Sequence, residues 1–188
     1  MIEIRPLEIA EILEIRVAKR LDARGFFSEV YNARAWENAG ITSTFVQDNH
    51  SFSAMAGTLR GLHYQLPPHA QDKLVRVVSG RIFDVAVDIR HGSPSLGKWT
   101  GIELSAADWN QLFIPAGFAH GFVTLVPDTE VVYKVSAHYN ATAERTIRFD
   151  DPQIGIKWPS TGVVHQLSDK DRNAPGLAEA QLFEPSFS

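Results

Sequence analysis

The sequence predicts a mainly β domain whose antiparallel strands form a sandwich or a barrel. Short β-type segments follow one another through the centre of the chain, at residues 73–90, 100–105, 111–126 and 129–139. Turn residues separate these segments, and few helix signals lie among them. Closely spaced strands of this kind favour antiparallel packing over alternating strand–helix units.

The remaining elements follow from local signals. Residues 33–40, ARAWENAG, predict a short helix that ends at Gly40. Ser79 and Gly80 separate two apolar strands and predict a β-hairpin at that point. Residues 151–180 are punctuated by proline and glycine, so we expect this segment to wrap the barrel with one short helical turn.

Alternation along residues 81–89 separates two faces of a strand. Phe83 and Val85 share one face with the later apolar residues, and Asp84 and Asp88 share the other. Asp84 then has two open interpretations. It is either a surface carboxylate of a half-solvated strand or a group that lines a polar cavity and pairs with a cation.

Composition narrows the class of protein. The chain has 188 residues, a formal net charge of −4 and no cysteine, with 44% apolar and 21% charged residues. We expect one domain over residues 1–188, without disulfides or thiolate ligands and with no general affinity for nucleic acid. The N-terminus lacks the pattern of a signal peptide, and no apolar run approaches the roughly 18 residues that span a bilayer. The sequence therefore predicts a soluble cytoplasmic protein without a membrane partner.

A cationic cluster lies in residues 57–75, GTLRGLHYQLPPHAQDKLV. It contains Arg60, His63, His69 and Lys73. A metal site, an anion site and an acid–base site are all open interpretations. His69 lies in a Pro-Pro turn, where a surface histidine is expected.

The metal interpretation is disfavoured by the residues around the two histidines. Residues 114–122, IPAGFAHGF, resemble the second conserved motif of the cupin superfamily, whose members are jelly-roll barrels, and supply His120. Metal-binding cupins carry H-x-H and then a glutamate in their first motif. Here Gln65 replaces the second histidine after His63, and residues 65–80 contain no glutamate. Two imidazoles fall short of the usual three protein ligands, so we predict no metal site.

Without a metal, a histidine beside lysine and arginine indicates acid–base chemistry on an anionic or carbonyl substrate. Neighbouring cations depress the pKa of a histidine, and neutral imidazole is a competent base near pH 7. Lys73 or Arg60 could stabilise a developing oxyanion. These groups suit proton abstraction α to a ketone, which also requires a proton donor on the opposite face.

Strand geometry constrains the same residues. Arg60 and His63 are an odd number of positions apart, so a regular strand would place them on opposite faces. Both can enter one cavity only if the strand bulges, and Gly61 is the natural place. Tyr133 shares a face with Val131 and should point inward, although most inward tyrosines only fill space.

Motifs along nearly the whole chain resemble those of the dTDP-4-dehydrorhamnose 3,5-epimerase family. In chain order they are DARGFFSEVYN (22–32), FVQDNHSFS (45–53), GTLRGLHYQ (57–65), QDKLVRVVSGRIFDVAVDIRHGSPSLGKW (71–99), IPAGFAHGFVTL (114–125), VYKVSAHY (132–139), DDPQIGIKWP (150–159) and LSDKD (167–171). The combination is specific, although each motif alone would be weak. The resemblance implies a cupin-type double-stranded β-helix, or jelly-roll, barrel with a few short helices. It also implies a cofactor-independent isomerase that converts dTDP-4-dehydro-6-deoxy-D-glucose to dTDP-4-dehydro-L-rhamnose.

The resemblance further implies roles for individual residues. His63 matches the general base, Tyr133 the proton donor on the opposite face, and Lys73 the group that holds the C4 oxygen. Asp171 matches the carboxylate that supports the base, and Asp169, two positions earlier, is the alternative because the HQLSDKD motif is shifted from the commonest register. The positions that match substrate contacts are Arg24, Glu29, Gln47, Asn49, Arg60, His120, Tyr139, Glu144 and Lys170.

The last expectations concern the binding partners of the protein and the functions that compete with the epimerase interpretation. The family resemblance implies a dTDP-sugar substrate and a homodimer in which residues 24–29 reach the nucleotide site of the neighbouring subunit. Both C3–H and C5–H are acidified by one ketone, so no redox cofactor is needed, and no glycine-rich dinucleotide motif is present. The rival functions are a single-centre epimerase or ketoisomerase of a related nucleotide sugar. A metal cupin or a non-catalytic sugar-binding barrel is a third possibility.

Overall fold

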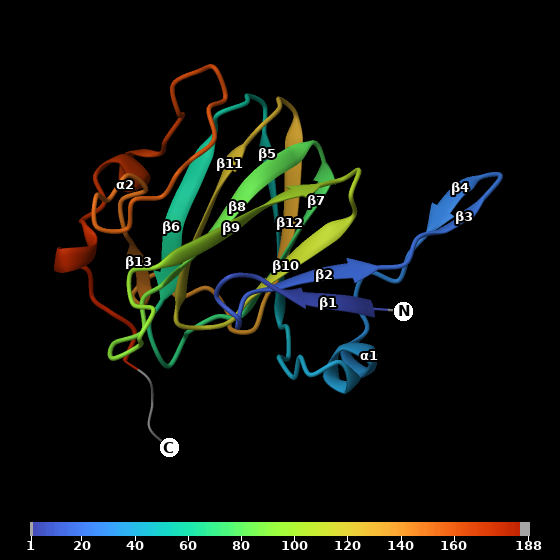
Figure 1. Cartoon of the computed structure of the whole chain (residues 1–188), viewed down its shortest axis with the longest axis horizontal. Helices are drawn as coiled ribbons and strands as arrows, with labels where there is room; N and C mark the ends of the chain where they lie inside the picture. The colour runs from blue at the N-terminus through green and yellow to red at the C-terminus, as the bar shows by residue number, and fades with distance from the viewer. Residues whose placement is uncertain (1, 185–188) are drawn as a thin grey trace.

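The structure, a computed structural model that describes residues 2–184, consists mainly of two antiparallel sheets (Figure 1). The larger sheet contains, in spatial order, β1 (Ile2–Pro6), β2 (Leu13–Val17), β10 (Asn110–Ile114), β7 (Lys73–Ser79), β12 (Thr129–Val135) and β5 (Gln47–Ser53). The smaller contains β13 (Glu144–Thr146), β6 (Leu59–Gln65), β11 (Phe118–Thr124), β8 (Arg81–Asp88) and β9 (Trp99–Ser105). The prediction of a mainly β fold is confirmed.

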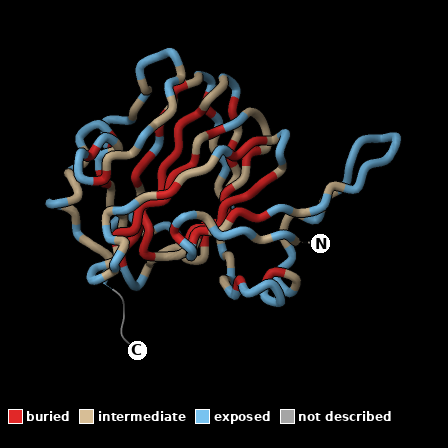
Figure 2. Tube along the Cα trace, in the orientation of Figure 1, coloured by how far each residue is buried: buried red, intermediate tan, exposed pale blue. Residues whose placement is uncertain are grey.

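The main core lies between the two sheets. Val75 and Val131 reach it from the six-stranded sheet, and Ile82 and Phe122 reach it from the five-stranded sheet. Buried parts of the chain are concentrated within these sheets, whereas the turns and the projecting arm are exposed (Figure 2). The interior is therefore closed on two sides by strands, as a sandwich or barrel requires.

The alternating pattern of β8 is resolved by this packing. Ala86 belongs to the core between the sheets, so Asp84 and Asp88, on the same face, also point inward, and both are fully buried. Val85 and Val87 lie on the outer face of the sheet. Of the two interpretations of Asp84, the surface carboxylate is wrong and the inward group is correct.

The C-terminal segment covers that outer face. Ile154 and Trp158 pack in the cluster that contains the outward valines of β8. The segment then forms the short helix α2 (Asp169–Arg172) and a 3₁₀ turn at Leu177–Glu179. The prediction that this segment wraps the barrel with a short helical turn is confirmed. The path of the segment places α2 beside the opening of the interior.

The predicted helix near residue 35 is α1 (Ala33–Asn38). The side chain of Asn32 caps it by accepting a hydrogen bond from the Ala35 amide at 3.2 Å. Trp36 is buried against the six-stranded sheet, and Gly40, with a φ of +91°, follows the C-cap residue Ala39. The left-handed conformation explains why glycine stands at the end of this helix.

The predicted hairpin at Ser79–Gly80 is wrong. β7 pairs with β10 and β12, whereas β8 pairs with β9 and β11, so the two strands belong to different sheets. Gly80 has a φ of +78°, and a Cβ at this position would collide with Thr129. A tight glycine turn therefore passes the chain from one sheet to the other instead of pairing the strands that flank it.

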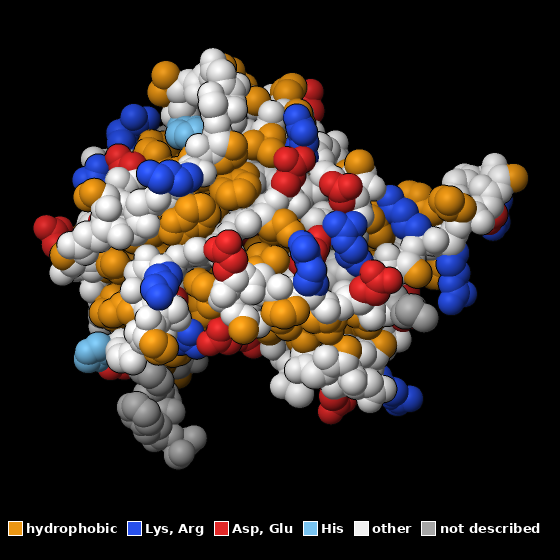
Figure 3. Space-filling model, in the orientation of Figure 1, with side chains coloured by type: hydrophobic (Ala, Val, Ile, Leu, Met, Phe, Trp, Pro, Cys, Tyr) orange, Lys and Arg blue, Asp and Glu red, His pale blue; other side chains and the backbone are white. Residues whose placement is uncertain are grey.

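A two-stranded arm projects from the body (Figure 1) and consists of β3 (Arg20–Asp22) and β4 (Gly25–Phe27). Leu21, Phe26 and Phe27 are exposed on it, and Figure 3 shows hydrophobic side chains along the arm. Separately, no helix among the described residues is both long enough and apolar enough to cross a membrane.

Candidate active site

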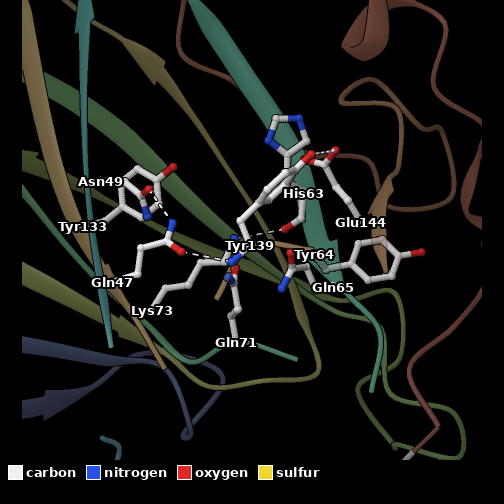
Figure 4. Close-up of a pocket in the computed structure, with 10 residues that line it drawn as sticks. All are labelled: Gln47, Asn49, His63, Tyr64, Gln65, Gln71, Lys73, Tyr133, Tyr139 and Glu144. Carbon is white, nitrogen blue, oxygen red and sulfur yellow. Dashed lines mark hydrogen bonds between the residues drawn. The ribbon is translucent and has the colours of Figure 1, made fainter. Parts of the chain in front are cut away.

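Two cavities between the sheets share His63, Lys73 and Tyr133 and form one site. The smaller has a volume of about 120 Å³ (Figure 4), and its other lining residues include Gln47, Asn49, Gln65, Gln71, Tyr139 and Glu144. The larger has a volume of about 280 Å³, and its other lining residues include Ser51, Arg60, His120, Phe122, Lys170 and Asp171. Most of the residues predicted for the site are therefore brought together.

His63 and Asp171 form a hydrogen-bonded pair. His63 projects from β6, and its Nε2 lies 2.5 Å from Oδ1 of Asp171, which is carried by α2. Burial raises the pKa of Asp171, but the hydrogen bond from His63 and its charge outweigh this effect and leave the pKa below the ordinary value. An ionised carboxylate can only accept, so Nε2 carries the proton and Nδ1 holds the free lone pair.

The alternative carboxylate, Asp169, is not part of this pair. It is the exposed first residue of α2, whereas Asp171 is 3% exposed. Ser168 caps the helix by accepting from the Asp171 amide at 3.1 Å, which fixes the direction of the turn. The structure therefore selects Asp171 as the partner of His63.

The imidazole of His63 is held neutral by its surroundings. Burial lowers its pKa, the hydrogen bond and charge of Asp171 oppose this, and the positive charges of Lys170 and Lys73 lower it further. The net pKa lies below the ordinary value for histidine. A neutral, oriented imidazole with a free Nδ1 is a base ready to accept a proton near pH 7.

Tyr133 reaches the same cavities from the opposite sheet. It lies on β12 of the six-stranded sheet, whereas His63 lies on β6 of the five-stranded sheet (Figure 4). Burial raises the pKa of the Tyr133 phenol, while the charge of Arg60 partly opposes this. The phenol is thus protonated at neutral pH. It can donate a proton to a molecule in the cavity from the side opposite His63.

Lys73, at the start of β7, lines both cavities together with these two residues. It is 7% exposed, and its Nζ donates to the backbone carbonyl of His63 at 3.5 Å. Burial lowers its pKa to about 8, and the nearby carboxylate of Asp84 acts against that change. The ammonium is therefore a desolvated cation, which binds a developing oxyanion more strongly than a hydrated one.

Arg60 and His63 enter the site together because β6 is bulged. The pairing of β6 with β11 shifts between Arg60↔Phe122 and His63↔His120, as the predicted bulge requires. Gly61 has a φ of +122°, and a Cβ there would lie 2.5 Å from the Cα of Gly121. The predicted bulge at Gly61 is confirmed, since no other residue type could approach the neighbouring strand so closely.

The mouth of the site is held by a chain of polar contacts. The Gln47 amide donates to Asn49 at 2.8 Å, and its carbonyl accepts from the Tyr139 amide at 3.0 Å. The Tyr139 hydroxyl donates to Glu144 at 3.3 Å, and Lys170 forms an ion pair with Glu144 at 2.8 Å. Five of the predicted binding residues therefore contact one another at this rim.

Gln65, which stands where a metal-binding cupin has its second histidine, has a different task. Its Nε2 donates to the carbonyls of His69 at 2.6 Å and His138 at 3.3 Å, and its Oε1 accepts from the Asn140 amide at 2.7 Å. This buried side chain thus ties two turns together and holds the segment that carries Tyr139. Among the described residues, no group of three or more potential metal ligands is found.

Comparison with known proteins decides the family. The family model for dTDP-4-dehydrorhamnose 3,5-epimerase matches residues 6–179. The enzyme of that name from Sinorhizobium fredii is 51% identical over 173 residues, which cover 92% of this chain and 88% of the relative. The chain belongs to the dTDP-4-dehydrorhamnose 3,5-epimerase family.

Solved structures of this epimerase family share the fold. The epimerase of Legionella pneumophila, in complex with dTDP-4-keto-L-rhamnose, matches with a TM-score of 0.94 and 43% identity, covering 99% of this chain and 100% of the other. A 3'-monoepimerase of Streptomyces bikiniensis, in complex with dTDP-quinovose, matches with a TM-score of 0.86 and 33% identity, covering 92% and 87%. The predicted cupin-like fold is confirmed by these matches.

Two predicted epimerase residues lie outside the site within one chain. Arg24 sits at the tip of the β3–β4 arm, fully exposed and paired with Asp22 at 2.5 Å. Glu29 lines a separate cavity of about 190 Å³ beside Trp36. The fold of a single chain does not bring them to His63.

Other lining residues of the epimerase site were not predicted. Ser51 could have been found, because it shares a strand face with Gln47 and Asn49. Phe122 and Ser168 gave no signal of their own, since an aromatic strand residue and a helix cap are common in any fold. Gln71 was likewise hidden in a turn.

Proposed function

We propose that the chain epimerises both C3 and C5 of dTDP-4-dehydro-6-deoxy-D-glucose to give dTDP-4-dehydro-L-rhamnose, in dTDP-L-rhamnose biosynthesis. The observation that carries this is the placement of one base, His63, and one acid, Tyr133, on opposite sheets, with the buried cation Lys73 lining the same cavities. Inversion requires removal of a proton on one face of the sugar and its return on the other. Family membership supplies the substrate class.

The chemistry follows from the three groups that line both cavities. Nδ1 of His63 takes the proton from C3 or C5, and the C–H electron pair moves through the adjacent carbon onto the C4 oxygen. Lys73 stabilises this enolate oxygen by charge and hydrogen bonding. Tyr133 then gives its phenolic proton to the carbanion carbon on the opposite face, which restores the ketone. Exchange with solvent returns a proton to Tyr133 and removes one from His63, and the cycle repeats at the second carbon.

No cofactor is required for this sequence of steps, because the ketone of the substrate is itself the electron sink. Removing one oriented acid or base typically costs about 10²- to 10⁴-fold in rate. The rival is a single-centre epimerase, and the 3'-monoepimerase of Streptomyces bikiniensis shows that the fold accommodates one.

Incubation with the keto-sugar nucleotide in D₂O separates the two functions. Deuterium at both C3 and C5, observed by NMR together with the L-rhamno product, is the expected result. Label at one carbon with a single inversion would establish the rival. Tight binding of the nucleotide sugar without exchange at either carbon would make the protein a sugar-binding barrel.

A homodimer completes this proposal. Arg24 and Glu29 lie on or beside an arm that reaches away from the body, and the arm exposes Leu21, Phe26 and Phe27. Such an apolar arm needs a partner surface, and a second copy would bring both polar residues to its nucleotide site. Light scattering should give twice the monomer mass, and Arg24→Ala should raise KM without changing that mass. A monomer with full activity would refute the shared site.

We also place the enzyme in the cytoplasm. The chain has no cysteine, which suits a reducing compartment. Cell fractionation alongside a marker of the cytoplasmic compartment tests this location.

A further inference from the structure

Asp84 and Lys73 are oppositely charged groups buried inside the barrel with incomplete hydrogen bonding. Asp84 is fully buried; its Oδ1 accepts from Nε2 of His120 at 2.8 Å, and its Oδ2 has no partner among the described residues. The Lys73 ammonium has one contact there, the His63 carbonyl at 3.5 Å. A buried charge without a counter-charge is costly, and the charge of Asp84 acts on Lys73 inside the barrel, although no hydrogen bond or ion pair joins the two among the described residues.

The other carboxylates around Lys73 are already engaged. The ionisable groups that line the two cavities from the neighbouring elements are Arg60 and His63 on β6, His120 on β11, Tyr133 on β12, Glu144 on β13, and Lys170 and Asp171 on α2. Glu144 forms its ion pair with Lys170 at 2.8 Å, and Asp171 binds His63 at 2.5 Å. Asp84 differs from these two carboxylates because its Oδ2 has no hydrogen-bond partner among the described residues.

We propose that Asp84 is a positioning residue of this enzyme: its carboxylate keeps the Lys73 ammonium charged inside the barrel and fixes His120 with its proton on Nε2. The assignment rests on the proposed function, because it concerns the cation that stabilises the enolate. Asp84 acts through Lys73 and His120. Its hydrogen bond leaves Nδ1 of His120 as an acceptor, a role that a freely rotating imidazole would not keep.

The electrostatics agree with the geometry. Burial lowers the pKa of Lys73, and Asp84 is the largest influence that raises it, ahead of Glu144. Removing the charge of Asp84 should therefore lower the pKa of Lys73 further. Because Lys73 must be protonated to hold an enolate, activity would then be lost at a lower pH on the alkaline side.

The test compares Asp84→Asn with Asp88→Asn. Both aspartates are fully buried on the inner face of β8, but Asp88 is bound by Arg90, Ser93 and Ser95, away from the site. In profiles of kcat/KM against pH, Asp84→Asn should move the alkaline limb down by about one pH unit, the lower end of the effect of a nearby charge. Asp88→Asn should lower the melting temperature and leave that limb in place. An unmoved limb in Asp84→Asn, or an equal shift in Asp88→Asn, would overturn the proposal.

Two measurements need no turnover, so they separate this proposal from the proposed function. The double variant Lys73→Met/Asp84→Asn should melt at a higher temperature than Asp84→Asn alone, because Asp84→Asn leaves the Lys73 ammonium without its counter-charge. A lower melting temperature for the double variant would contradict the proposed interaction. In the unaltered protein, ¹⁵N NMR of the histidines should show His120 protonated on Nε2 and bare on Nδ1. The opposite tautomer would exclude the bond to Asp84.

Discussion

Nε2 of His63 lies 2.5 Å from Oδ1 of Asp171, although 108 residues separate the two in sequence. The contact determines which nitrogen of the imidazole is free. Because the ionised carboxylate accepts from Nε2, only Nδ1 is available to take a proton from a substrate carbon. Asp171 thus orients the base and stabilises the imidazolium that forms, as the carboxylate of a catalytic triad does.

Asp171→Asn tests this pairing against its neighbour. The amide keeps the shape but removes the charge that holds the imidazole, so kcat should fall by about 10²-fold or more. Asp169→Asn is the matched control, because Asp169 is exposed on the same helix, and it should remain within about twofold of the unaltered enzyme. Steady-state kinetics measures kcat for both variants. Equal losses of kcat in the two variants would show that Asp171 has no special role in the mechanism.

The pH dependence should be bell-shaped. His63 must be neutral to accept a proton, and burial sets its pKa below the ordinary value, so activity is present above that pKa and fades as the pH falls through it. Lys73 must be charged, and its pKa of about 8 makes activity fade as the pH rises through that value. The pKa of Tyr133 is raised, so the phenol does not limit the alkaline side first.

Profiles of kcat/KM from about pH 5 to about pH 10 should show both limbs. Lys73→Met should lose the alkaline limb near pH 8 together with most of the activity. Activity that continued to rise through about pH 10 in the unaltered enzyme would contradict the role of the Lys73 ammonium.

Tyr133→Phe separates deprotonation from inversion. The variant keeps His63 and Lys73, so an enolate can still form and recapture a solvent-derived proton from the same face. We expect the epimerised product to fall by at least about 10²-fold while deuterium from D₂O still enters the unreacted isomer. NMR of both isomers measures the two rates together. A variant that inverts its substrate at the normal rate would show that the proton comes from another group.

Gly61→Ala should distort the site through the backbone. A Cβ at Gly61 would lie 2.5 Å from the Cα of Gly121, in a conformation with φ of +122°. We expect a loss of about 2 kcal/mol or more in the free energy of unfolding, together with a loss of activity. Gly155→Ala is the control, since its φ is also positive but its nearest atom is 3.8 Å away. Urea unfolding compares them, and equal costs would mean that left-handed conformation alone explains the effect.

The sequence predicts much of this architecture, and the reasons are local. Strand alternation and the parity of Arg60 and His63 were enough to predict the bulge at Gly61, because side chains on a strand alternate strictly. The same alternation could not say which face of β8 points inward, since both faces are covered: one by the opposite sheet and the other by the C-terminal wrap. Alternation alone therefore leaves the orientation of Asp84 open, and the packing of Ala86 between the sheets determines it.

Other features depend on pairing between distant segments. Ser79 and Gly80 carry the signal of a hairpin, yet the strands they join pair with partners elsewhere in the chain. Asp169 and Asp171 differ by two positions, and only the direction of α2, set by the Ser168 cap, decides between them. Arg24 and Glu29 match family positions, but one chain alone does not place them at His63.

The C-terminal wrap has a consequence for how activity is acquired and lost. One segment both covers the outer apolar face of the five-stranded sheet and, at α2, supplies the carboxylate of the base. A barrel in which this segment had not yet docked would contain His63, Tyr133 and Lys73, but its base would lack orientation. Local detachment of the segment would therefore silence the enzyme while most of its hydrogen-bonded strands stayed intact. Catalytic competence would then return only when the segment docks on the sheet again.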